Sequence, residues 1–78
     1  MSAEAVRQEF LVSIPADISG DVMGSKEYAK GKAIGLLSAR GLYPVGEFNF
    51  YQITGEAGQQ RAMYFNVQAQ TKTQISLL

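Results

Sequence analysis

Hydrophobic and polar positions alternate along the first ordered part of this chain. Phe10, Val12 and Ile14 fall on one face of an extended segment over residues 10–14, which predicts a strand with one buried face. Pro15 ends this strand, because proline has no N–H to donate to a sheet.

Two further strands are predicted in the second half. Residues 48–53 are rich in aromatic and β-branched side chains, and strict alternation places Phe48 and Phe50 on one face and Tyr51 and Ile53 on the other. A polar segment with two glycines follows, as is typical of a hairpin loop.

The returning strand, over residues 61–69, has the clearest alternation in the chain. Its two faces are Met63, Phe65, Val67 and Ala69 on one side, and Ala62, Tyr64, Asn66 and Gln68 on the other.

Between the first two strands, the apolar spacing changes to that of a helix over residues 25–40. Two starts are compatible with the sequence: Asp21 can cap a helix from Val22, or Ser25 can cap one from the next residue. We expect a helix by Ser25 and leave residues 22–24 open. Gly41 is well placed as the left-handed residue that ends the helix. The predicted apolar stripe consists of Ala29, Ala33, Leu36, Leu37 and Arg40, with Ile34 beside it.

Gly31 and Gly35 lie inside this helix, where each costs about 1 kcal/mol relative to alanine. Such a pair lets another backbone or a bulky ring come close. We favour tight packing within the chain over contact with a second molecule, and both alternatives remain open.

The order strand, helix, strand, strand is the opening of a ferredoxin-like sandwich. We therefore predict an α+β fold, a truncated ferredoxin-like βαββ(β) sandwich with one helix on an antiparallel sheet. Residues 1–8 are expected to form a flexible N-terminal arm, and residues 9–78 a single domain. The tail ends in apolar residues, and either a fourth strand or a subunit contact would cover them.

The amino-acid composition limits the ligands and partners that we expect for this chain. The chain has no Cys and no His, and equal numbers of basic and acidic residues. We therefore expect no metal and no cofactor, and the neutral charge argues against a nucleic-acid role. No apolar run is long enough to span a membrane, so a cytoplasmic protein is expected.

Aromatic residues on both faces of the hairpin predict a partner. One helix covers only one face of the sheet, so we expect self-association as a dimer or a larger assembly. Alternatively, the tyrosines simply keep their hydroxyls in water. The predicted interface residues are Phe48, Phe50, Tyr51, Tyr64 and Leu77.

Three segments carry a resemblance to a known family: Phe10-Leu11-Val12, Pro15-Ala16-Asp17 and Ala39-Arg40-Gly41. Over residues 9–67 the chain resembles the front part of the muconolactone isomerase-like family. The resemblance implies a ferredoxin-like fold and an oligomer, but no catalytic residues. Those proteins continue into a second helix and a last strand, for which this chain has no room.

Acid–base chemistry would have to use Asp, Glu, Lys or Tyr. The candidates are Glu47, Tyr51, Tyr64 and Lys30, together with Asp17 and Asp21. For each we favour an ordinary structural role, which for Asp17 and Asp21 is that of a turn or cap residue. Two functions follow: a small homo-oligomeric binding or structural assembly module, which we favour, or an isomerase-like enzyme or small-ligand-binding protein with a pocket at a subunit interface. Whether the chain is an enzyme is left open.

Overall fold

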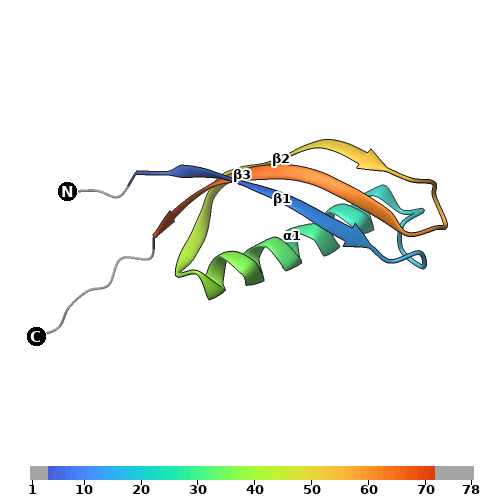
Figure 1. Cartoon of the computed structure of the whole chain (residues 1–78), viewed down its shortest axis with the longest axis horizontal. Helices are drawn as coiled ribbons and strands as arrows, with labels where there is room; N and C mark the ends of the chain where they lie inside the picture. Colours follow the sequence, from blue (N-terminus) through green and yellow to red (C-terminus); the bar gives the residue numbers. More distant parts are fainter. Residues whose placement is uncertain (1–3, 72–78) are drawn as a thin grey trace, which may run out of the picture.

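The computed structural model describes residues 4–71 and contains one helix and three strands. The strands form one antiparallel sheet in the order β1-β3-β2, and the helix α1 lies along one face of it (Figure 1). This is the α+β arrangement predicted, one helix on an antiparallel sheet, and it is consistent with a truncated ferredoxin-like fold. The elements are β1 Val6–Ile14, α1 Val22–Ala39, β2 Leu42–Thr54 and β3 Arg61–Thr71.

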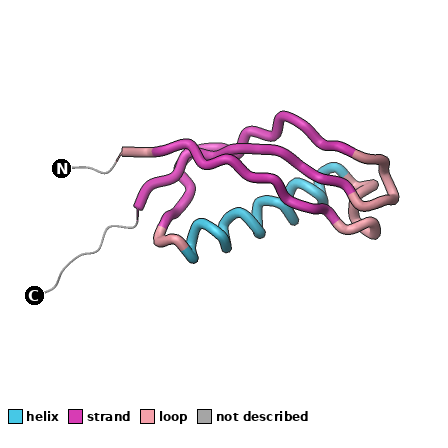
Figure 2. Tube along the Cα trace, viewed as in Figure 1, coloured by secondary structure: helices cyan, strands magenta, loops and turns pink. Residues whose placement is uncertain are grey.

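The core lies between the sheet and α1, as the two layers in Figure 2 show. Its centre is Phe65 on the middle strand, which is fully buried and lies opposite Phe10 of β1 and Phe50 of β2. The ring centroids are 5.4 Å apart for Phe10 and Phe65, and 5.0 Å apart for Phe50 and Phe65. A row of three aromatic rings therefore crosses all three strands beneath the helix.

The predicted faces of β1 and β3 are confirmed. Alternate residues of both strands are buried against α1, and the residues between them are more exposed. The buried set is Phe10, Val12, Ile14, Met63, Phe65, Val67 and Ala69.

β2 is longer than predicted, and one of its residues lies on the opposite face from the one predicted. It begins at Leu42 rather than near Phe48, and its pairing with β3 shifts register twice. The second shift, between Phe50 and Gln52, inserts Tyr51 as an extra residue. Ile53 therefore lies opposite Met63 on the helix side, and its predicted location on the same face as Tyr51 is wrong.

The helix begins at Val22, the earlier of the two predicted starts. Asp21 occupies the capping position but makes no side-chain capping hydrogen bond. Ser25, the other candidate cap, is instead buried inside the helix, where its Oγ donates to the carbonyl oxygen of Ile18 at 3.1 Å. At the other end Gly41 has a φ of 73°, as the left-handed residue predicted there should.

The buried stripe of α1 is narrower than predicted. Ser25, Ala29, Ala33 and Leu37 are buried, one residue per turn. Leu36 and Ile34 are 47% and 46% exposed, and Arg40 is exposed as well. In the described part of the chain no second helix lies beside α1, so only its line of contact with the sheet is covered.

The interior glycines do not serve packing within the described chain. A Cβ added at Gly31 or Gly35 would meet no atom within 4 Å, so the favoured interpretation of tight intramolecular packing is wrong. Both glycines lie two residues from a buried position, on the outward side of α1.

The ends of the chain differ in how far they are described. β1 begins at Val6, so residues 6–8, expected in the arm, belong to the sheet. The apolar end of the tail, including Leu77, lies outside the described residues, as does the question of a fourth strand.

Candidate binding surface on the open face of the sheet

The face of the sheet opposite α1 has no cover within residues 4–71, and we call it the open face (Figure 1). Its side chains alternate with those of the core along each strand, so the same backbone that builds the core also places them. The open face includes Arg7, Glu9, Leu11, Asn49, Tyr51, Tyr64, Asn66 and Gln68.

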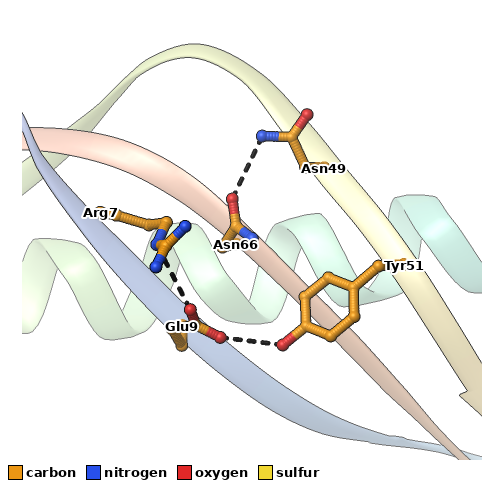
Figure 3. Close-up of polar contacts among 5 residues, drawn as sticks. All are labelled: Arg7, Glu9, Asn49, Tyr51 and Asn66. Atoms are coloured by element: carbon orange, nitrogen blue, oxygen red, sulfur yellow. Dashed lines mark hydrogen bonds and ion pairs between the residues drawn. The ribbon is translucent and has the colours of Figure 1, made fainter.

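A polar network crosses the open face from one edge to the other (Figure 3). The Tyr51 hydroxyl on β2 donates a hydrogen bond of 2.8 Å to Oε1 of Glu9 on β1. Arg7 lies 3.3 Å from the other carboxylate oxygen of Glu9, Nε to Oε2. Since β3 lies between these strands, the Tyr51 side chain bridges the central strand.

This network changes the acidity of one group. The hydrogen bond to Glu9, followed by desolvation and the negative charge of Glu9, raises the pKa of Tyr51 above its ordinary value. The hydroxyl therefore remains a neutral donor at physiological pH. Its one proton is donated to Glu9, and a raised pKa does not suit a phenolate that acts as a base.

Two further polar pairs join β2 to β3. Nδ2 of Asn49 donates to Oδ1 of Asn66 at 3.1 Å, and the Tyr43 hydroxyl donates to Oε1 of Gln70 at 2.9 Å. Both pairs are exposed, so water competes with them and each contributes little to stability. They hold the side chains of the open face in defined positions.

The exposed side chains of Leu11 and Tyr51 and the half-buried side chain of Tyr64 form a group that we call the aromatic cluster. Leu11 is 58% exposed and lies directly opposite Tyr64, and the Tyr51 and Tyr64 ring centroids are 6.3 Å apart. Polar residues adjoin the cluster along the strands. An apolar centre with a polar rim is the usual composition of a protein–protein contact.

The predicted catalytic residues do not form one site. Tyr51 and Tyr64 lie together on the open face, whereas Lys30 lies on α1, which covers the opposite face. There the Lys30 ammonium contacts Glu27 at 3.4 Å and lies 5.8 Å from the ring centroid of Phe48. Glu47 is an exposed residue of β2.

Two expected interface residues lie away from the open face. Phe48 and Phe50 are half-buried and pack against the core on the helix side. Leu77, the third apolar residue of that expectation, lies outside the described residues.

A shallow cavity of about 260 Å³ opens on the helix side, between the start of α1 and β2. We call it the α1–β2 groove. The Lys26 ammonium lies beside it, 5.4 Å from the ring centroid of Phe50. The groove is mainly apolar, with a cation at its rim. Its lining is Val22, Lys26, Phe50, Tyr51, Gln52, Ile53 and Met63.

Sequence reasoning missed the two charged residues of the network. Arg7 and Glu9 were expected in or beside the arm, although Arg7, Glu9 and Leu11 already alternate with Gln8 and Phe10. Extending that alternation by three residues would have placed both charges on the open face. The partners of Tyr51 and Asn49 could not have been found, because they depend on the pairing register between strands, which the pattern of one strand does not contain.

Among the described residues, no group of three acidic residues lies close enough to hold a metal ion. Nor is any described helix long and apolar enough to cross a membrane. Comparison with models of protein families, with curated proteins and with solved structures found no match for this chain.

Proposed function

We propose that this protein is a small cytoplasmic module whose function is self-association, through the part of the sheet that α1 leaves uncovered. The aromatic cluster is the observation that carries the proposal. Leu11 and Tyr51, 58% and 54% exposed, lie beside Tyr64 on a face with no cover in the described chain. Burial of such a cluster against a second copy is favourable, at about 25 cal/mol for each Å² of apolar surface.

Catalysis has less support than association. Acid–base work needs a donor and an acceptor within reach of one substrate atom. The four candidates are divided between the two sides of the sheet and its β2 edge, and the hydroxyl of Tyr51 is already bound to Glu9.

The experiment is the molar mass in solution by light scattering, across a dilution series. We expect the wild type to be an oligomer and Tyr64→Lys to shift it toward monomer, because Tyr64 is at the centre of the aromatic cluster. Met23→Lys is the matched control, since Met23 is 68% exposed on α1 and distant from the open face. A wild type that stays monomeric at high micromolar concentration would refute the proposal, and so would a Tyr64→Lys variant with unchanged mass.

A second candidate function is binding of a small anionic aromatic or aliphatic molecule in the α1–β2 groove. The apolar lining and the ammonium of Lys26 support it. The resemblance to muconolactone isomerase-like proteins, with pockets near subunit contacts, favours the same class.

Anilinonaphthalene sulfonate, an anionic aromatic dye, is a suitable probe for this groove. We expect its fluorescence to rise with the wild type and to fall with Lys26→Glu. Lys32→Glu is the control, because Lys32 lies over the ring of Tyr28 instead of Phe50. Equal binding by the two variants would remove the groove as a ligand site.

A further inference from the structure

We infer that two copies of this chain pair along the exposed edge of β1, antiparallel, with Arg7 of each copy opposite Glu9 of the other. The inference rests on the proposed self-association and adds to it a second contact, at the edge of the sheet, which leaves the aromatic clusters free for contact through the open face. It follows from the difference between the two edges of the sheet and from the order of charges along β1.

Within residues 4–71 the edges of the sheet are β1 and β2, since β3 lies between them. β2 carries two register shifts in its pairing with β3, and Pro44 removes one of its backbone donors. Bulges and prolines are the features by which proteins prevent an edge from pairing with another chain. β2 is therefore a protected edge.

β1 has neither feature. It pairs with β3 at nine successive positions without a register shift, and no proline interrupts it between Val6 and Ile14. Its outer side presents a regular row of N–H and C=O groups, which is a template for a further strand. The unprotected edge is thus the one that can accept a partner.

A second copy of β1 can meet this edge only in certain registers. Side-chain direction and hydrogen-bond direction both alternate along a strand, so facing residues of two antiparallel copies must both be odd or both be even. A two-fold axis at Arg7 or at Glu9 puts like charges directly opposite, which is destabilising. An axis at Gln8 puts Arg7 opposite Glu9 twice, and only this axis pairs the charges.

The same register also gives an apolar contact on the helix side of the paired strands. With the axis at Gln8, Val6, which is 57% exposed, lies opposite Phe10 of the second copy on the helix side. Axes at Phe10 or Leu11 instead place both charged residues opposite uncharged ones. Self-complementarity, in charge and in apolar contact, therefore selects a second copy of this chain as the occupant.

Pairing along β1 makes the open faces of the two copies into one continuous face. Two three-stranded sheets become one sheet of six strands, with both helices on one face. The other face carries four alternating charges at its centre, and one aromatic cluster on each side of them.

The chain has no cysteine, so a single introduced thiol reports on one position. In Gln8→Cys the two thiols face each other across the axis, at a separation close to that of a disulfide. Under mild oxidation we expect covalent dimer to form at least about tenfold faster than in Leu11→Cys or Gln52→Cys. Leu11 is exposed on the same strand and Gln52 is exposed on the β2 edge, so both control for accessibility. Fastest crosslinking at either control position overturns the inference.

Charge reversal is the second test. Arg7→Glu faces Glu9 of the other copy, so we expect the dimer dissociation constant to rise by about tenfold. Adding Glu9→Arg restores the charge pairs in reversed order and should restore the mass. An unchanged mass in Arg7→Glu, or a double variant that stays dissociated, overturns the register.

These outcomes separate the inference from the function on which it rests. A wild-type monomer refutes self-association itself. A stable oligomer in which Gln8→Cys does not crosslink refutes only the β1 contact, and leaves the aromatic cluster as the contact surface.

Discussion

The two faces of β3 share one backbone but differ in the burial of their side chains and in the contacts that those side chains make. Met63, Phe65 and Val67 are 0–2% exposed and pack beneath α1, whereas Tyr64 and Asn66, between them, make lateral contacts with neighbouring strands on the open face. Within residues 4–71, α1 covers one face of this strand and no segment covers the other. Buried and more exposed side chains therefore alternate along the same strand.

The two faces also differ in what each contact contributes. Burial of a large apolar side chain stabilises a fold by about 1.5–3 kcal/mol. An exposed hydrogen bond or ion pair contributes about 0–1 kcal/mol, because water competes for the same groups. The open face can therefore change with little loss of stability, and the covered face cannot.

The largest expected effect is that of Phe65→Ala. Phe65 is fully buried and contacts the rings of Phe10, Phe48 and Phe50, so its loss should lower the free energy of unfolding by about 3–5 kcal/mol. Urea denaturation followed by circular dichroism measures it, and a domain of this size would be largely unfolded by such a loss.

Tyr64→Ala is the matched control, since Tyr64 is the next residue of the same strand on the opposite face. We expect a loss of about 1 kcal/mol or less in the monomer. Equal losses at the two positions would show that the faces do not differ as described.

The second effect concerns the outward side of α1. Gly31→Ala and Gly35→Ala should each stabilise the domain by about 0.5–1 kcal/mol, because each removes backbone freedom and the added methyl group has open space. In a domain this small, the pair should raise the melting temperature by several degrees.

Ala33→Gly is the opposite control, because Ala33 is buried against the sheet in the same helix. It should destabilise by more than about 1 kcal/mol. Stabilisation of the monomer together with loss of the oligomer would instead identify the outward glycines as a contact with a second copy.

The smallest effect is a pH dependence on the open face. The pKa of Tyr51 is raised in the folded chain by its hydrogen bond to Glu9, so that bond stabilises the fold below the unfolded pKa of about 10. Its contribution is lost as pH rises through the folded pKa. NMR titration of the Tyr51 ring should show a lower pKa in Glu9→Gln.

Glu56→Gln is the control for this titration, since Glu56 is an exposed carboxylate in the β2–β3 loop and is no partner of Tyr51. It should leave the pKa of Tyr51 unchanged. A Glu9→Gln variant with an unchanged Tyr51 titration would contradict the polar network.

Sequence patterns predicted the fold wherever a single period ran without interruption. Residues 10–14 and 61–69 alternate strictly, and their faces were confirmed. The prediction for Ile53 failed because Tyr51 is inserted at a register shift, and a shift is a relation between two strands that one strand's pattern does not contain. The helix boundaries were close, because capping residues and Gly41 mark them locally.

Less of the candidate site than of the fold could be predicted from the sequence. Tyr51 and Tyr64 were identified as residue types, but Arg7 and Glu9 were missed, and Lys30 and Glu47 were grouped with residues that they do not meet. Exposed polar side chains leave no periodic signal that separates a partner from a neighbour.

The amino-acid sequence by itself determined the order of the elements, the buried side of two strands and the neutral, cysteine-free chemistry of the chain. Each of these depends on local periodicity or on composition. Tertiary structure alone decided that Tyr51 meets Glu9, that the helix glycines face outward, and that β1 is a regular edge while β2 is a broken one. Those features depend on register and packing between segments far apart in the chain, where free energies of many small contacts are summed.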